Sequence, residues 1–152
     1  MKLMIGQWQY WVIQQSYING TGPPPVPHPI HLHGHDFYIL DSQAGSSWDG
    51  DISRLKTDNP IRRDTASLPE QGYLVLAFES DNPGAWLMHC HVPFHISAGL
   101  GVQFLERADE IQTPVEGLKT MEQGCRNWKA WEDEYFPEGS LAEGDSGLRR
   151  RR

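Results

Sequence analysis

The chain has 152 residues, the size of one compact domain, and 38% of them are hydrophobic, which is typical of a globular protein and not of a disordered one. Twenty acidic against thirteen basic residues give a formal net charge of −7, which argues against nucleic acid as a partner. No apolar run reaches the roughly 18–20 residues of a membrane-spanning helix, so no membrane partner is expected. Two cysteines are too few for a small disulfide scaffold, and the residues after Met1 turn polar too soon for a secretory signal peptide.

Short apolar segments separated by glycine and proline predict an all-β fold. In chain order, β-branched and aromatic residues predict strands over 8–15, 37–40, 73–79, 85–91 and 100–106. Five prolines and two glycines predict an extended loop over 19–29, and 41–72 is expected to be mostly loop. Many short strands with such turns favour a β-sandwich or a barrel.

The last part of the chain has a different pattern. Met121, Cys125, Trp128 and Trp131 recur at helical spacing, which predicts a short C-terminal helix that begins near Thr120. The residues after 137 are polar and rich in glycine, so they are expected to form a tail.

All seven histidines lie in two short clusters. The first spans residues 28–35 and contains His28, His31, His33 and His35. The second spans residues 89–95 and contains His89, His91, His95 and Cys90. An isolated histidine is usually a structural or surface residue, but that interpretation does not explain two such dense clusters, so the sequence predicts metal binding.

The second cluster predicts two separate ligand sets. Side chains alternate between the two faces of a strand, so His89 and His91 point to one side and Cys90 to the other. One segment can then serve two metal sites that are joined by a few covalent bonds, which suits electron transfer. His31 and His33 have the same spacing and could join His89 and His91 at one site with several metal ions.

The ligand types favour copper. A structural zinc site usually contains cysteine pairs, and the chain has neither a CxxC nor an HExxH motif. Two histidines, one cysteine and a weak axial position are typical of a blue-copper site, and His28, Cys90 and His95 supply the three ligands. Leu100 is the axial candidate, and its side chain offers no bond, which would raise the reduction potential. A non-haem iron site needs a carboxylate, for which Asp36 is the only obvious candidate.

Two segments, HPIHLHGH at 28–35 and HCHVPFHISAGLGVQFLE at 89–106, closely resemble the copper motifs of multicopper oxidases, and of laccases in particular. TDNPIRRDT, SDNPGAW and the DSGL tail before four arginines resemble ascomycete fungal laccases. The resemblance implies the third, C-terminal cupredoxin domain of such an enzyme. We therefore expect a cupredoxin-like Greek-key β-sandwich over 1–136, with its first strands missing, and a tail over 137–152.

The resemblance also implies roles for individual residues. The type 1 copper would be held by His28, Cys90 and His95, with Leu100 in the axial position. The type 2 copper would be held by His31. The type 3 copper pair would be held by His33, His89 and His91. The residues that carry electrons would be Cys90, His89 and His91. His35 matches a recurrent position that is not a ligand, so we expect it either to support the ligands from behind or to have a structural role.

The resemblance also bears on three further residues. Phe94 matches a position that lines the phenol pocket, or it packs in the core. Asp145 matches a position near the solvent tunnel to the trinuclear centre, where it could relay protons. Cys125 matches a cysteine that bridges to the first domain, or it is an inert buried thiol.

The implied activity is the one-electron oxidation of phenols or aromatic amines, coupled to the reduction of O₂ to water by a secreted enzyme. In the family, eight histidines hold the trinuclear copper centre, and this chain supplies four of them. The chain is therefore interpreted as a fragment that needs the remaining laccase domains as partners. The alternative is a copper-binding cupredoxin remnant without enzymatic activity.

Overall fold

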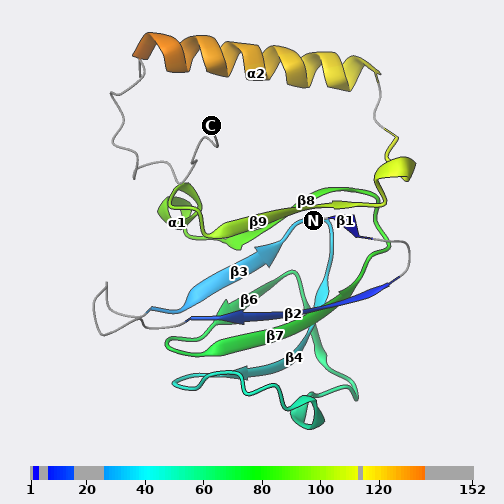
Figure 1. Cartoon of the computed structure of the whole chain (residues 1–152), viewed down its shortest axis with the longest axis vertical. Helices are drawn as coiled ribbons and strands as arrows, with labels where there is room; N and C mark the ends of the chain where they lie inside the picture. The colour runs from blue at the N-terminus through cyan, green and yellow to red at the C-terminus, as the bar shows by residue number, and fades with distance from the viewer. Residues whose placement is uncertain (1, 4–6, 16–25, 113–114, 136–152) are drawn as a thin grey trace.

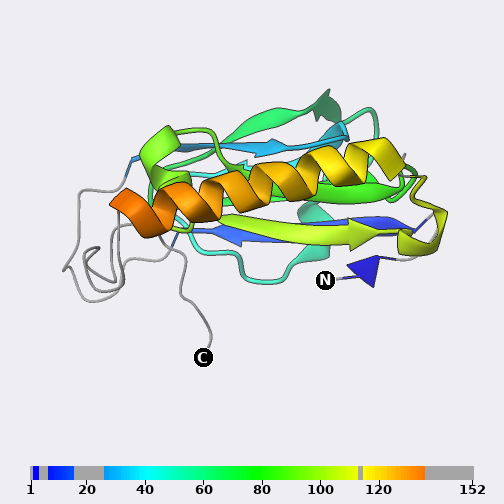
Figure 2. The same ribbon diagram turned by 90° about the horizontal axis from the view of Figure 1, so that it is seen from above.

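Two β-sheets pack face to face in the computed structural model, which describes residues 2–3, 7–15, 26–112 and 115–135 (Figures 1 and 2). The first sheet has the strand order β1-β9-β8-β3-β6, and the second has the order β2-β7-β4-β5. The strands are β1 (Lys2–Leu3), β2 (Trp8–Gln14), β3 (His28–Leu32), β4 (Phe37–Gln43), β5 (Ile61–Arg63), β6 (Thr65–Leu68), β7 (Tyr73–Glu79), β8 (Gly84–Cys90) and β9 (Gly101–Glu106). Short 3₁₀ turns at Ile52–Arg54 and Ala108–Glu110 and two α-helices complete the described elements. The structure confirms the predicted β-sandwich.

The core lies between the sheets and includes one face of β7. Six consecutive β7 residues, from Tyr73 to Phe78, are buried. Leu76 and Phe78 belong to the core cluster, where the Phe78 ring stacks on Phe104 of β9 with ring centroids 5.7 Å apart. On the other face of β7, the Trp48 ring packs against Tyr73 with centroids 5.3 Å apart. The continuous apolar run of β7 is thus covered on both faces, and only the final Glu79 is exposed.

The pairing of β3 with β8 determines which side chains enter the core. In this antiparallel pair, Ile30 lies opposite Cys90 and His31 lies opposite His89. Residues that face each other across two strands point to the same side of the sheet. Because Ile30 and Cys90 belong to the core cluster, His31 and His89 point to the outer face of the sheet.

Three strands occupy segments that were predicted to be loops. Strand β3 begins at His28, inside the predicted loop 19–29, and β5 and β6 lie inside the predicted loop 41–72. Strand β5 pairs with β4, and β6 pairs with β3. Segments of three or four residues contain too few positions to show an alternating pattern. Their conformation depends on a distant strand that supplies the hydrogen bonds.

The C-terminal helix α2 (Val115–Tyr135) differs from the prediction in two ways. It begins before Thr120, and its 21 residues make it long, where a short helix was expected. Almost all of its described side chains are exposed, including the apolar Met121 and Trp128. Within the described ranges, no helix is long and apolar enough to cross a membrane. The predicted tail over 137–152 lies outside the described residues.

The turn that connects β3 to β4 depends on Gly34. Its φ angle is +73°, in a region that residues with a Cβ atom rarely adopt. A Cβ atom on Gly34 would lie 2.6 Å from the indole ring of Trp86. The indole is itself held in place, because its Nε1–H donates a hydrogen bond of 2.8 Å to the carbonyl of Asn82. Any other residue at position 34 therefore requires a local rearrangement.

We predict that the Leu76→Ala variant loses about 2–5 kcal/mol of unfolding free energy, because Leu76 is fully buried in the core and its truncation leaves a cavity. Urea denaturation followed by circular dichroism measures the loss. The control is Ile52→Ala, since Ile52 is 71% exposed and its truncation should change the stability by no more than about 0.5 kcal/mol. Equal losses in the two variants would contradict the assignment of β7 to the core.

We predict that the Gly34→Ala variant loses about 2–5 kcal/mol of unfolding free energy. A left-handed backbone conformation costs about 1–2 kcal/mol for a residue with a Cβ atom, and overpacking against Trp86 costs about 1–3 kcal/mol. Gly45→Ala is the matched control. Gly45 also has a positive φ, of +63°, but no atom lies within 4 Å of its added Cβ, so only the backbone cost of about 1–2 kcal/mol remains. Thermal denaturation compares the variants, and a Gly34→Ala variant no less stable than Gly45→Ala would refute the close contact with Trp86.

Candidate metal centre

Three potential metal ligands from three parts of the chain converge at one end of β8. Nδ1 of His28 lies 3.1 Å from Nδ1 of His95, and Sγ of Cys90 lies 3.6 Å from the first atom and 3.4 Å from the second. The point equidistant from these atoms is about 2 Å from each, which is close to the usual length of a bond from a transition metal to a histidine nitrogen. Among the described residues, this is the only group of three or more His, Cys, Asp or Glu ligand atoms that lie within 4.8 Å of one another.

Strand β8 and helix α1 (Pro93–Ser97) hold two of these ligands. Cys90 is the last residue of β8, and its side chain is fully buried. Pro93 begins the helix, where its restricted φ angle and missing N–H suit the first turn. The chain then returns through Leu100, whose carbonyl accepts the N–H of Cys90 at 3.1 Å and whose N–H donates to the carbonyl of His95 at 2.9 Å. These backbone hydrogen bonds keep Leu100 beside both ligands.

The third ligand and the neighbouring aromatic ring lie nearer to the surface. Gln15 places its side-chain Nε2 3.1 Å from Nε2 of His28, on the side of the ring away from Cys90. The Phe94 ring packs edge-on against His95, with centroids 4.7 Å apart. Phe94 is 70% exposed, so the alternative that it packs in the core is wrong.

Four histidines gather on the opposite side of β3 and β8, and we call them the histidine face: His31, His33, His89 and His91. The ring centroid of His31 lies 5.0 Å from that of His33 and 5.7 Å from that of His91. The Nε2 atoms of His33 and His89 approach to 2.9 Å. The fold thus brings together the four histidines that the sequence placed at one site, across the sheet from the Cys90 thiol.

Hydrogen bonds to Nδ1 determine that Nε2 is the nitrogen that keeps its lone pair in two of these rings. Nδ1 of His31 lies 3.0 Å from the carbonyl oxygen of Asp64 and 3.0 Å from Oγ1 of Thr65. Nδ1 of His89 lies 2.9 Å from the carbonyl oxygen of Cys90. Because a carbonyl oxygen only accepts, both Nδ1 atoms carry the proton and both Nε2 atoms keep their lone pair. Histidines that bind metals usually donate their other N–H in this way.

The surroundings favour the neutral form of one histidine on each side of the sheet. Burial lowers the pKa of His28, and the nearby His95 lowers it further. Burial also lowers the pKa of His33, with further contributions from the three other rings of the histidine face. Both residues therefore keep the unprotonated, ligand form to a lower pH than an ordinary histidine does.

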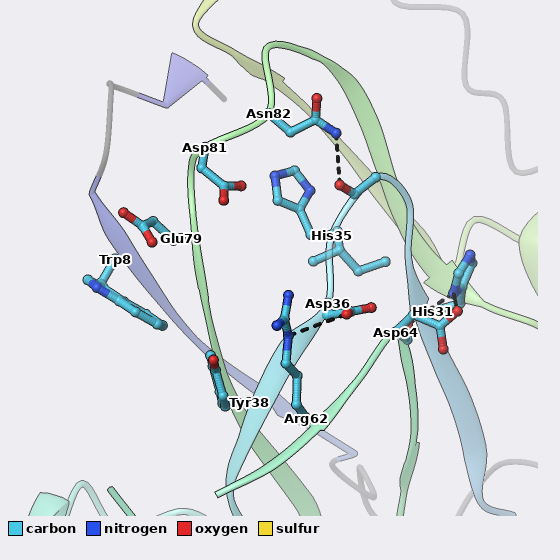
Figure 3. A pocket seen from close by; sticks show the side chains of 12 residues that line it. Trp8, His31, His35, Asp36, Tyr38, Arg62, Asp64, Glu79, Asp81 and Asn82 are labelled. Carbon is cyan, nitrogen blue, oxygen red and sulfur yellow. Dashed lines mark hydrogen bonds and ion pairs between the residues drawn. The ribbon is translucent and has the colours of Figure 1, made fainter. Parts of the chain in front are cut away.

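A polar pocket of about 750 Å³ borders the histidine face, and His31 contributes to its lining (Figure 3). Its acidic lining residues are Asp36, Asp64, Glu79 and Asp81. Arg62 lies 3.3 Å from the Asp36 carboxylate across this recess. None of the three residues of the Cys90 set lines the pocket.

Two predicted residues lie outside both clusters. Asp145 lies beyond the described residues, so its role stays a prediction. Cys125 is an exposed free thiol on α2, so the alternative of an inert buried thiol is wrong. Gln15 and Thr65 were not predicted, because their contacts with the histidines join segments that are distant in the chain.

Comparisons with known proteins identify the family of this chain. A family model described as multicopper oxidase matches residues 1–110. A laccase from Neurospora crassa is 44% identical over 158 residues, which cover 95% of this chain and 24% of that protein. Laccase-1 from Melanocarpus albomyces is also 44% identical, over 97% of this chain and 25% of the relative. The crystal structure of a laccase from Botrytis aclada matches with a TM-score of 0.72 and 39% identity, over 97% of this chain and 26% of that one.

The similarity thus extends over nearly the whole chain, while the chain spans only about a quarter of the length of these laccases. The structural match also identifies the sandwich as cupredoxin-like. Taken with the two histidine clusters, these matches show that the chain belongs to the multicopper oxidase family and is similar to the C-terminal domain of fungal laccases.

Proposed function

We propose that this chain is the third cupredoxin domain of a secreted laccase-type oxidase, which oxidises phenols or aromatic amines by one electron at a time and reduces O₂ to water. The observation that carries the proposal is the placement of two ligand sets on opposite sides of one strand. Cys90 meets His28 and His95 on the core side of β8, and the histidine face lies on the outer side.

The Cys90 set fits a type 1 copper ion in both ligand type and spacing. Two imidazole nitrogens and one thiolate are the ligands of blue-copper sites. The three atoms form a nearly regular triangle, with sides of 3.1, 3.4 and 3.6 Å. Copper held there would supply one-electron redox chemistry. In our proposal Leu100 occupies the axial position, where its side chain offers no ligand atom and favours a high potential.

The residues of the chain provide the path between the two ligand sets. Cys90 is joined through the backbone to His89 on one side and to His91 on the other. Its thiol lies among the first set of ligands, and the two neighbouring rings belong to the histidine face. An electron that reaches the thiolate therefore has a route of a few covalent bonds to the outer side of the sheet.

We propose that the substrate that donates electrons binds at the exposed edge of the Cys90 set. Phe94 is exposed and packs edge-on against the ligand His95. Aromatic rings pair favourably in edge-on or offset arrangements. We propose that a phenol or aromatic amine binds against Phe94 and passes its electron through His95.

We propose that the histidine face holds the copper ions that would receive these electrons. In this assignment His31 binds the type 2 copper, and His33, His89 and His91 bind the type 3 pair. The other half of the ligands would come from the remaining laccase domains, since the curated relatives are about four times as long as this chain. Asp145 is proposed to relay protons to this centre.

We predict that the chain loaded with Cu(II) develops a strong absorption band near ~600 nm and that the Cys90→Ser variant lacks it, because the band requires a thiolate ligand. The matched control is Cys125→Ser, which removes the exposed thiol on α2 and should keep the band. Copper content and visible spectra are measured on the same samples. A band that survives Cys90→Ser, or a wild-type chain that shows no band, would sink the proposal.

We predict that Leu100→Met lowers the reduction potential of the bound copper, since a thioether supplies the axial ligand that leucine lacks and stabilises Cu(II). Leu105→Met on the same β-hairpin is the matched control, because the two leucines are 37% and 38% exposed. Redox titration of the visible band reports both potentials. An unchanged or raised potential in Leu100→Met would exclude the axial role.

A further inference from the structure

A histidine and a glutamate that the proposed reaction does not use form a buried pair between the sheets. Nε2 of His35 lies 2.9 Å from Oε2 of Glu106, and the two side chains are 2% and 0% exposed. Neither atom has any other hydrogen-bond partner among the described residues. Aromatic rings pack on the imidazole, with the centroids of Phe78 and Trp86 5.2 and 5.8 Å from its own.

The contacts of this pair satisfy its buried polar atoms. Nδ1 of His35 donates to the carbonyl oxygen of His33 at 3.1 Å. Oε1 of Glu106 accepts the backbone N–H of Asn82 at 2.7 Å. Because the two remaining polar atoms, Nε2 and Oε2, meet each other, the burial of the pair is tolerable.

The pair belongs to a network that surrounds a residue of the histidine face. The N–H of His33 donates to the carbonyl of Leu87 at 2.9 Å, and its carbonyl accepts from His35. The next carbonyl, that of Gly34, accepts from the side chain of Asn82 at 2.9 Å (Figure 3). Both peptide groups around His33 are therefore fixed, one of them directly by the buried pair.

The orientation of the His33 ring depends on this backbone. Its Nε2 atom lies 2.9 Å from that of His89, which comes from another strand. A small rotation of the His33 peptide would move the ring away from its neighbour. Position 34 must also remain glycine for the turn to pass Trp86, so the turn has few alternative conformations in which to compensate.

We propose that His35 and Glu106 are positioning residues, which hold His33 in the orientation that lets the histidine face bind metal. Glu106 anchors the imidazole to β9, and the imidazole holds the carbonyl of His33. The inference rests on the proposed metal-binding role of the histidine face. It adds that this buried polar pair controls the affinity for metal at the histidine face but not at the Cys90 set.

The test is a titration of the ¹⁵N-labelled chain with Zn(II), followed through the histidine ring signals in NMR spectra. Zinc accepts histidine and cysteine ligands and has no redox chemistry, so the signals of His33 and His89 report one site and those of His28 and His95 report the other. We expect Glu106→Leu to weaken zinc binding at the histidine face roughly 10–100-fold, the usual cost of losing an outer partner of a metal ligand. Affinity at the Cys90 set should stay unchanged.

Glu106→Gln is the matched control. Its amide oxygen can accept the N–H of Asn82, and its amide nitrogen can donate to a neutral His35, so every contact survives without the carboxylate. We expect wild-type affinity at both sites. Equal weakening at both sites in Glu106→Leu, or no weakening at either, overturns the positioning role. A wild-type chain that binds no zinc at the histidine face overturns this inference together with the metal-binding role of that face.

His35→Gln is a second, independent variant and replaces Glu106→Leu if circular dichroism shows that the leucine variant does not fold. Its amide nitrogen can still donate to Oε2 of Glu106, but no donor remains for the carbonyl of His33. The same selective loss of zinc affinity at the histidine face is expected. If His35→Gln binds zinc at that face as tightly as the wild type does, the His33 carbonyl contact has no positioning effect and the inference fails.

Discussion

The register between β3 and β8 is the constraint on which the two ligand sets depend. It places Ile30 opposite Cys90 on the core side and His31 opposite His89 on the outer side. Because side chains alternate along a strand, a slip by one residue would turn the thiol outward and the histidines into the apolar core. The buried contacts of Ile30 and Cys90 oppose such a slip. The same packing that stabilises the sandwich therefore separates the two proposed ligand sets, one with a cysteine and one with histidines alone.

Around this pairing, the two ligand sets are completed in different ways. Two members of the Cys90 set are close in the chain, since His95 follows within one short helix and Leu100 bonds to the backbone of both residues, while His28 comes from β3. The histidine face is built from two strands and from hydrogen bonds to more distant segments. Asp64 and Thr65 lie in contact with His31, and the buried Glu106 contacts His35, which donates to the carbonyl of His33. Such outer contacts orient ligand rings and set which nitrogen keeps its lone pair.

Sequence-based prediction succeeded for long segments with a continuous pattern and failed for short segments whose hydrogen-bond partners are distant in the chain. The continuous apolar run of β7 was recognised as a strand, and the structure confirms it. Strands β5 and β6 were missed, because three or four residues show no periodicity and their hydrogen bonds come from β4 and β3. The helical spacing near Met121 was recognised, but the start of α2 was placed five residues too late. Its first turn contains Gly117 and Val115, which are weak helix formers.

The sequence by itself determined the chemistry of the ligands. The density of histidines, the single cysteine between two of them and the period-two alternation indicated two sites on opposite faces, and the motifs indicated the family. Only the tertiary structure decided which atoms meet, with the Nδ1 atoms of His28 and His95 around Cys90 and the Nε2 atoms of His33 and His89 across the sheet. It also revealed the pair of His35 and Glu106, residues 71 positions apart. Distances between strands and the burial of polar atoms arise from packing, which a local sequence pattern does not encode.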